Sequence, residues 1–314
     1  MRLFSYEDPA EGPSLGLIDT DRIVPLPAYS LSAELIQEDR LAGLRRRLRP
    51  LSGSVGLDRS NLRPLPAVEP EKIVCVGLNY RDNVAEGAGR EAPEWPLLFA
   101  KFANTVIADG GPIVRPEGTH ALDLEVELGV VIGRRARRVP IERAMDFVAG
   151  YIVVNDVSAR DWQGNKSALR EGEKGDGQWL RAKGSDTFLP MGPVFATADE
   201  LDPAAGIRLR SWRIPGPGRP GAGEAQPMQD GSTADMLFSV PELVSFIRRH
   251  ITLDPGDVNA TGTPSGVGVF RDPPIFLEPG DRVRCEIDGI GSVENPIIDW
   301  TDVPSEPPES PSLA

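Results

Sequence analysis

The sequence contains little cysteine and little histidine. Its two cysteines, Cys75 and Cys285, stand in the alternating apolar segments KIVCVG and RVRCEI, which is typical of buried strand residues. Two such thiols do not build a disulfide framework, so we expect a reducing, cytoplasmic location. The two histidines, His120 and His250, are too few for a histidine-rich zinc site. Any metal is therefore expected to bind oxygen ligands.

The sequence also lacks long apolar runs and an excess of positive charge. No run approaches about 18 apolar residues, and residues 1–12 hold no apolar stretch of signal-peptide length, so we expect no membrane partner. Lys and Arg total 34 against 47 Asp and Glu, and the net charge of −13 disfavours a nucleic-acid partner. A small anionic substrate remains compatible, because a local group of cationic side chains overrides the global charge.

Glycine and proline, in contrast, are abundant, with 33 and 31 residues, which favours short strands and loops over long helices. We expect a mainly β, α+β protein with a small N-terminal α+β domain at 1–66 and a catalytic domain at 67–302. The Pro/Ser-rich stretch 303–314 is expected to be a disordered tail.

Apolar alternation and β-branched residues predict most of the individual elements. In the N-terminal domain we expect strands at 1–6 and 15–18 and a helix at 32–48. The catalytic domain is expected to hold strands within 72–80, 96–102, 124–133, 149–158 and 281–291, and helices at 141–148 and 240–250. The Gly/Pro-rich segment 213–231 is predicted to be the tip of an extended hairpin.

The segment Asp123-Leu-Glu125-Val-Glu127 carries the strongest chemical signal. Residues two apart on a strand share a face, so these three carboxylates are expected to point the same way. They repel one another unless a positive charge neutralises them, and a divalent cation supplies one. The alternative is a solvated edge strand, which the apolar VVIG run that follows disfavours.

Three further segments carry candidate site residues. Asp156 follows four apolar residues and is expected at the inner end of a buried strand, either on a metal or paired with Arg160. Lys183 precedes a glycine and is either close to a bound molecule or an ordinary surface lysine. The segment 256–268 offers backbone N–H groups and the Thr263 hydroxyl to an anion, or is an ordinary Gly/Pro turn.

Taken together and in this order, these segments resemble the fumarylacetoacetate hydrolase (FAH) family. The resemblance spans 72–298 and rests on CVGLNYRDNVAE (75–86), LDLEVELGVVIG (122–133), AGYIVVNDVSARDWQ (149–163), KGSDTFLPMGP (183–193), PGDVNATGTPSGVG (255–268) and LEPGDRVRCEIDGIG (277–291). It implies a mixed β-sandwich roll with a metal at its mouth, a small N-terminal domain before it, and a homodimer. The family hosts several reactions on one scaffold, so the substrate is defined only weakly.

The resemblance also assigns roles to residues of this chain. It implies that Glu125, Glu127 and Asp156 bind a metal, usually Mg²⁺, with Mn²⁺ or Ca²⁺ as alternatives, and that Asp123 supports them. It makes Lys183 a catalytic lysine. It implies substrate contacts at positions 80, 81, 160, 163 and 263, which are Tyr80, Arg81, Arg160, Gln163 and Thr263.

One position departs from the hydrolytic members of the family. They carry a histidine on a lid over the metal, and that histidine pairs with a glutamate three residues on to activate water; here Asn83 and Glu86 occupy these positions. An amide does not titrate near neutral pH, so the usual dyad is in doubt. Glu86 acting alone, or His120 as a substitute base, are the remaining routes to an activated water. The segment 82–95 is expected to close as the lid.

These observations predict a metal-dependent enzyme acting on a 2-oxo acid or a 1,3-dicarbonyl acid of the acylpyruvate type. Hydrolysis of a carbon–carbon bond is the first expectation. The alternative is an isomerase or tautomerase, a decarboxylase or a dehydratase, which Asn83 favours because none of them needs an activated water. A non-catalytic protein that binds a 2-oxo acid through the same metal site is a further alternative.

Overall fold

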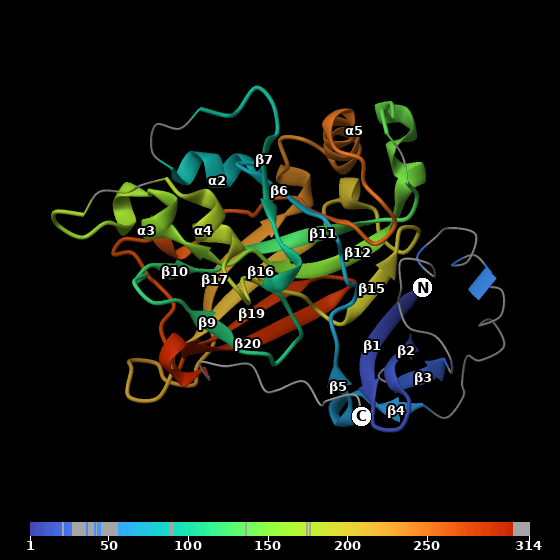
Figure 1. Cartoon of the computed structure of the whole chain (residues 1–314), viewed down its shortest axis with the longest axis horizontal. Helices are drawn as coiled ribbons and strands as arrows, with labels where there is room; N and C mark the ends of the chain where they lie inside the picture. The colour runs from blue at the N-terminus through green and yellow to red at the C-terminus, as the bar shows by residue number, and fades with distance from the viewer. Residues whose placement is uncertain are drawn as a thin grey trace, which may run out of the picture.

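The computed structural model describes residues 1–20, 22–26, 36, 41, 43–44, 56–87, 91–135, 137–173, 175 and 177–303. The helix predicted at 32–48 falls mostly outside these residues, and so does the tail predicted at 303–314 apart from Val303. Both stay predictions. The described residues are mostly strands joined by short helices, which confirms the predicted fold class (Figure 1).

One long mixed sheet crosses the molecule. In the described part of the chain it has eleven strands, in the order β4-β3-β2-β1-β15-β12-β11-β18-β6-β7, with β5 also pairing to β1. The strands are β1 (Arg2–Asp8), β2 (Gly12–Asp19), β3 (Arg22–Leu26), β4 (Leu57–Asp58), β5 (Arg63–Pro64), β6 (Ile73–Gly77), β7 (Leu97–Lys101), β11 (Val126–Ile132), β12 (Val148–Asn155), β15 (Val194–Thr197) and β18 (Val258–Ala260). Because β1 pairs with β15, the strands β1 to β5 extend the same sheet as the later strands. The domain boundary at 66 remains a prediction.

A second sheet of five described strands packs against the centre of the first. Its order is β17-β16-β19-β20-β9, and β16, β19 and β20 lie against β11 and β12. The strands are β9 (Ile113–Arg115), β16 (Arg208–Ile214), β17 (Gln226–Ser232), β19 (Arg282–Ile287) and β20 (Gly291–Asp299). β16 and β17 form an antiparallel hairpin, which confirms the hairpin predicted at 213–231. Two short pairs, β10 (Leu122–Asp123) with β13 (Ser158–Ala159) and β8 (Val106–Ile107) with β14 (Leu189–Pro190), complete the strands.

The central strands β11 and β12 are buried on both faces. Leu128 and Val130 belong to the core between the two sheets, while Val131 belongs to a second core on the opposite face. Successive side chains of a strand alternate between faces, so a strand buried on both sides has the near-continuous apolar sequence seen here. Cys75 on β6 and Cys285 on β19 are free and buried, as predicted.

The helices are short and lie at the edges of the sheets (Figure 1). They are α2 (Arg81–Glu86), α3 (Arg160–Gln163), α4 (Trp179–Gly184), α5 (Val240–His250) and the 3₁₀ turns η2 (Arg59–Asn61), η3 (Ala103–Thr105), η4 (Ile141–Phe147), η5 (Lys166–Ala168), η6 (Pro203–Ala205), η7 (Thr233–Asp235), η8 (Gly268–Phe270) and η9 (Trp300–Asp302). α5 matches the helix predicted at 240–250 and begins with a capping box between Ser239 and Glu242. The helix predicted at 141–148 is the 3₁₀ turn η4, because β12 already begins at Val148. α2, α3 and α4 gather on one side of the sheets, where the candidate site lies.

Candidate active site

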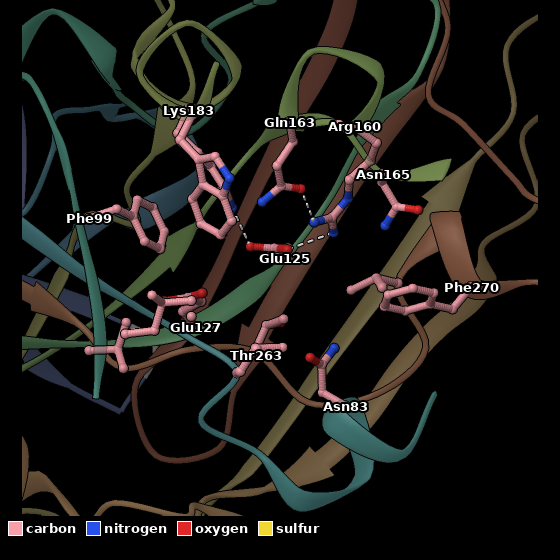
Figure 2. Close-up of a pocket in the computed structure, with 17 residues that line it drawn as sticks. Asn83, Phe99, Glu125, Glu127, Arg160, Gln163, Asn165, Lys183, Thr263 and Phe270 are labelled. Atoms are coloured by element: carbon pink, nitrogen blue, oxygen red, sulfur yellow. Dashed lines mark hydrogen bonds and ion pairs between the residues drawn. The ribbon is translucent and has the colours of Figure 1, made fainter. Parts of the chain in front are cut away.

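A cavity of about 170 Å³ opens where α2, α3 and α4 meet the ends of the central strands. Figure 2 shows side chains from these elements converging on it. Its aromatic wall consists of Phe99, Trp179 and Phe270. Its polar wall consists of Asn83, Glu125, Glu127, Arg160, Gln163, Asn165, Lys183 and Thr263. Seven residues predicted from the sequence to form the site therefore line one cavity: Asn83, Glu125, Glu127, Arg160, Gln163, Lys183 and Thr263.

Three buried carboxylates form a potential metal site beside the cavity, which Glu125 and Glu127 line and Asp156 does not. One carboxylate oxygen from each of Glu125, Glu127 and Asp156 lies within 4.8 Å of the other two. All three residues are buried, and β11 lies between β12 and β18, so the alternative of a solvated edge strand is wrong. The prediction of one continuous strand through the carboxylates is also wrong, because the chain leaves the strand at Leu124–Glu125, between β10 and β11.

The interruption separates Asp123 from the other carboxylates. Asp123 accepts hydrogen bonds from the backbone N–H groups of Gly268 and Val269 and from Arg160 Nε at 2.9 Å. Arg160 Nη2 in turn lies 2.6 Å from Glu125 Oε1. Asp123 therefore orients Glu125 through the guanidinium of Arg160.

Two lysines pair with the remaining oxygen of Glu125 and with both oxygens of Asp156. Lys183 Nζ lies 2.7 Å from Glu125 Oε2 and 2.8 Å from Asp156 Oδ2, above the ring of Phe99. Lys101 Nζ lies 2.7 Å from Asp156 Oδ1. Asp156 therefore pairs with two lysines, and the alternative of an Asp156–Arg160 ion pair is wrong. Lys183 is buried, so the alternative of a surface lysine is wrong as well.

The charges of this cluster leave one carboxylate without a cation. Four buried carboxylates face three buried cations, namely Asp123, Glu125, Glu127 and Asp156 against Lys101, Arg160 and Lys183. Glu127 accepts one hydrogen bond from Gly262 N at 2.9 Å, and within the described ranges no cationic side chain forms an ion pair with it. A divalent cation would supply the missing positive charge and prefers oxygen ligands. The residues present therefore fit a hard divalent metal.

The pKa shifts have the same electrostatic origin. Burial, together with the charges of Asp156 and Glu125, raises the pKa of Glu127 well above its usual range. Burial alone would raise the pKa of Asp156, but Lys101 and Lys183 hold it below its usual value. Burial would lower the pKa of Lys183, yet Asp156 and Glu125 raise it, so this lysine keeps its proton.

The segment 256–268 forms the next part of the wall. Two of its backbone N–H groups already donate hydrogen bonds to carboxylates of the protein. Gly262 N donates to Glu127, and Gly268 N donates to Asp123, so neither is available to an external anion. Thr263 lines the cavity, and its hydroxyl donates to Val126 O at 2.8 Å. The expectation of an anion-binding loop is therefore corrected for these amides.

Helix α2 brings Asn83, but not its neighbours, to the cavity. Figure 2 shows Asn83 projecting from α2 toward the side of Thr263 and Phe270. Among the described residues that line the cavity, Tyr80, Arg81 and Glu86 do not appear. Tyr80 is fully buried, and Arg81 is exposed with Nη1 3.4 Å from Ala234 O. Their predicted roles as substrate contacts stay predictions.

Glu86 is held by the backbone of the 261–268 segment. Its Oε1 accepts a hydrogen bond from Gly266 N at 2.7 Å, and burial raises its pKa. One turn earlier on α2, Asp82 accepts from both the N–H and the hydroxyl of Ser265. These two carboxylates fasten α2 to the 261–268 segment with Asn83 between them.

His120 lies outside the cavity wall formed by the described residues. Its Nδ1 is 3.2 Å from Asp161 Oδ2, and its Nε2 is 3.0 Å from Ala168 O. These contacts connect the segment before β10 to the turn after α3. The arrangement gives His120 a structural role beside the site.

Two residues of the site, Lys101 and Asn165, were not predicted from the sequence. Lys101 reads as an ordinary polar residue at the end of a strand, yet its Nζ also donates to the carbonyls of Val157, Lys183 and Phe188. Asn165 follows Gln163 by two residues, in a turn that the sequence pattern does not distinguish. A lysine in an otherwise apolar strand is the only local signal for Lys101.

Comparisons with known protein families, curated proteins and solved structures all relate this chain to one family of enzymes. Residues 72–298 match the family described as fumarylacetoacetate (FAA) hydrolase, C-terminal. The chain belongs to this family, as its resemblance implied, and is an enzyme of it.

Individual relatives carry tautomerase, isomerase and hydrolase names. The chain is 38% identical over 308 residues to oxaloacetate tautomerase fahd2, mitochondrial, of Xenopus laevis, which covers 95% of this chain and 90% of that protein. The solved 5-carboxymethyl-2-hydroxymuconate delta-isomerase from Mycobacterium smegmatis has a TM-score of 0.71 and 33% identity, covering 95% of this chain and 99% of that one. Fumarylacetoacetate hydrolase from the psychrophilic Exiguobacterium antarcticum has a TM-score of 0.73 and 30% identity, covering 95% and 99%.

Two findings concern where in the cell the protein is located. No helix of the described residues has the length and apolar character needed to cross a membrane. The Xenopus relative is named as mitochondrial. The predicted cytoplasmic location stays a prediction.

Proposed function

We propose that this chain catalyses keto–enol tautomerisation of a 2-oxo dicarboxylic acid, with a divalent cation on Glu125, Glu127 and Asp156. Oxaloacetate, named for the Xenopus relative, is the first substrate to test. In this reaction one proton leaves C3 and one proton is added to the oxygen on C2. No water is consumed and no carbon–carbon bond breaks, so the reaction needs no activated water.

The observation that carries the proposal is the position of Asn83 and Glu86. Asn83 faces the cavity where a water-activating base would be needed, and its amide cannot take up a proton near neutral pH. Glu86, the other half of the expected dyad, accepts a hydrogen bond from Gly266 N instead. This supports tautomerisation over hydrolysis as the reaction of the site.

The proposed cation would be held by the trio of carboxylates. When bound, a divalent cation polarises the carbonyl of a 2-oxo acid and makes the adjacent C–H more acidic. Glu125 and Asp156 are oriented for this role by Arg160, Lys101 and Lys183. Mg²⁺ is the first candidate, and Mn²⁺ and Ca²⁺ accept the same ligands.

Lys183 is the proposed proton carrier of the site. It is buried, lines the cavity and has a raised pKa because of Asp156 and Glu125. A protonated Nζ beside the substrate places a positive charge and a proton where negative charge develops in the enolate. We assign it the transfer of a proton to C3 of the enol; the enol oxygen loses its proton to solvent, and Lys183 then regains a proton from solvent.

The side-chain amides of Gln163 and Asn165 are the proposed hydrogen-bond donors to the second carboxylate of the substrate. Gln163 Oε1 accepts a hydrogen bond from Arg160 Nη1 at 3.1 Å, and Asn165 Oδ1 accepts from Ser167 N at 3.1 Å. With their oxygens engaged, both side chains retain N–H donors for a carboxylate. The aromatic wall excludes water around the reacting carbons.

Product analysis tests the proposal. The purified chain is incubated with Mg²⁺ or with a chelator, and is offered oxaloacetate, acetylpyruvate and fumarylacetoacetate in turn while proton NMR follows the products. Chelator-sensitive interconversion of keto and enol oxaloacetate without cleavage supports tautomerisation. Acetate or fumarate would instead establish carbon–carbon hydrolysis, the first expectation from the sequence.

Other products would identify the remaining alternatives. Pyruvate and carbon dioxide from oxaloacetate, above the rate with Mg²⁺ alone, would identify a decarboxylase. Tight calorimetric binding of a 2-oxo acid with no change in its spectrum would identify a binding protein. The predicted homodimer is tested separately by light scattering of the same preparation.

A further inference from the structure

The buried side chain of Gln229 connects the second sheet to the walls of the active site. It stands on β17, within the segment 213–231 that the sequence predicted as a hairpin, and it is 2% exposed. We propose that Gln229 is a positioning residue, which holds the backbone between the metal ligands Glu125 and Glu127 against the Thr263 loop. The inference rests on the metal site of the proposed function.

Gln229 uses its full hydrogen-bonding capacity in this position. Its Oε1 accepts from Val126 N at 2.9 Å and from Ser211 Oγ at 2.9 Å. Its Nε2 donates to Thr263 Oγ1 at 2.7 Å and to Pro264 O at 2.8 Å. An amide oxygen accepts two hydrogen bonds and an amide nitrogen donates two, so every donor and acceptor of this side chain has a partner. The side chain therefore has one orientation that satisfies every partner.

These contacts close a ring around the residue between the two glutamates. Val126 N donates to Gln229, Gln229 donates to Thr263, and Thr263 Oγ1 donates back to Val126 O at 2.8 Å. Val126 lies directly between Glu125 and Glu127, where the chain enters β11 after the interruption of the strand. The ring thus holds both backbone polar groups of the residue that spaces the two ligands.

The backbone of β17 also packs closely against the Thr263 loop, where glycine leaves room for the contact. A Cβ on Gly231 would lie 2.3 Å from Pro264 Cβ, and a Cβ on Gly266 would lie 2.2 Å from Met228 O. Gly266 also has a φ of +100°, which favours glycine. The return strand of the hairpin is therefore packed directly against the loop that completes the ring, and this gives the segment 213–231 a part in the site.

Substitution of Gln229 by glutamate separates positioning from packing. Gln229→Glu keeps the shape and the acceptors but cannot donate to Thr263 Oγ1 or Pro264 O while ionised. The matched control is Asn295→Asp on β20, a buried amide whose Nδ2 donates to Ala108 O and Gly111 O, neither of which lines the cavity. Both changes remove two donors to oxygen acceptors from the same sheet.

The measurement is Mn²⁺ affinity, by calorimetry and by electron paramagnetic resonance, with the thermal midpoint recorded for each variant. Residues that orient metal ligands typically change affinity by 10- to 100-fold, so Gln229→Glu is expected to weaken Mn²⁺ binding by about this factor. Asn295→Asp is expected to lower the thermal midpoint while its Mn²⁺ affinity stays within about threefold of the wild type.

The outcomes separate this inference from the metal site itself. A wild-type chain that binds no Mn²⁺ would contradict the proposed function, and with it the basis of the inference. With binding in the wild type, an unchanged affinity in Gln229→Glu, or an equal loss in Asn295→Asp, would overturn the positioning role. Should Gln229→Glu not fold, Thr263→Val breaks the same ring, and an unchanged Mn²⁺ affinity in that variant would overturn the inference.

Discussion

The two sides of the cavity are built on different principles. On the side of α4 and β11, ion pairs connect buried lysines and an arginine to buried carboxylates, with Lys183 bound to both Glu125 and Asp156. On the side of α2, the wall presents the neutral amide Asn83, and the acids of the helix bind the backbone of Ser265 and Gly266.

This difference separates two chemical tasks. The charged side can hold a cation and stabilise negative charge on a substrate, which every proposed reaction of the family requires. We propose that the α2 side determines whether a water is activated, because a base must lie within hydrogen-bond reach of that water. On this proposal, the residue at position 83 selects the reaction type without disturbing the charged side.

The charged side should be the more sensitive to substitution. Glu127→Ala removes one of three carboxylates from the metal site, and we expect Mn²⁺ affinity to fall by more than about 100-fold, beyond the effect of a supporting residue. Turnover should fall with it. Calorimetry and the NMR assay measure the two effects, and retained turnover in the variant would break the assignment of the metal site.

Lys183→Met distinguishes proton transfer from metal binding on the same side. Proton transfer by a positioned side chain contributes about 10²- to 10⁴-fold, so turnover should fall by this range. Mn²⁺ affinity should not fall, because the substitution removes a positive charge beside Glu125 and Asp156. Parallel losses of turnover and of Mn²⁺ binding would make Lys183 part of the metal site rather than the proton carrier.

A histidine at position 83 tests the α2 side of the cavity. Asn83→His places a titratable base at the cavity, and we expect cleavage of acetylpyruvate to rise by about 10-fold, at the low end for general base catalysis because Glu86 is engaged with Gly266. NMR detection of acetate gives the rate. If the wild type already cleaves acetylpyruvate faster than the variant, the role given to Asn83 is wrong.

The smallest effect is expected at Arg81, on the outer surface of α2. Its Nη1 lies 3.4 Å from Ala234 O, and the residue is exposed. Arg81→Ala should change kcat/KM for oxaloacetate by less than about twofold and the free energy of unfolding by less than about 0.5 kcal/mol. A tenfold rise in KM would instead support the substrate contact that the sequence predicted for this residue.

Sequence patterns indicated the carboxylates of the charged side because their signals are local, whereas the ligand set and the role of Lys183 came from the family resemblance. Alternation through Asp123, Glu125 and Glu127 indicated a common face, and the apolar run before Asp156 indicated burial. The pattern did not predict the interruption at Leu124–Glu125, because that break depends on acceptors supplied by Asn155 and Gln229, which bind the N–H groups of Glu125 and Val126. Contacts between distant residues leave no periodic signal.

The unpredicted residues of the site share this dependence on distant contacts. Lys101 binds carbonyls of residues 157, 183 and 188, which only the folded chain brings to one point. Glu86 appeared to be available as a base, but its Oε1 accepts a hydrogen bond from Gly266 N, 180 positions away. The fold class followed from apolar alternation, which each strand carries in its own sequence.

The central claim is that the cavity accelerates enolisation through a bound divalent cation. The most direct measurement is the rate at which enol oxaloacetate converts to the keto form, followed by absorbance, with the chain and Mg²⁺, with the chain and a chelator, and with Mg²⁺ alone. We predict a rate at least about 100-fold above that of Mg²⁺ alone, which the chelator abolishes. A rate equal to that of Mg²⁺ alone, or one that the chelator leaves unchanged, would contradict the account.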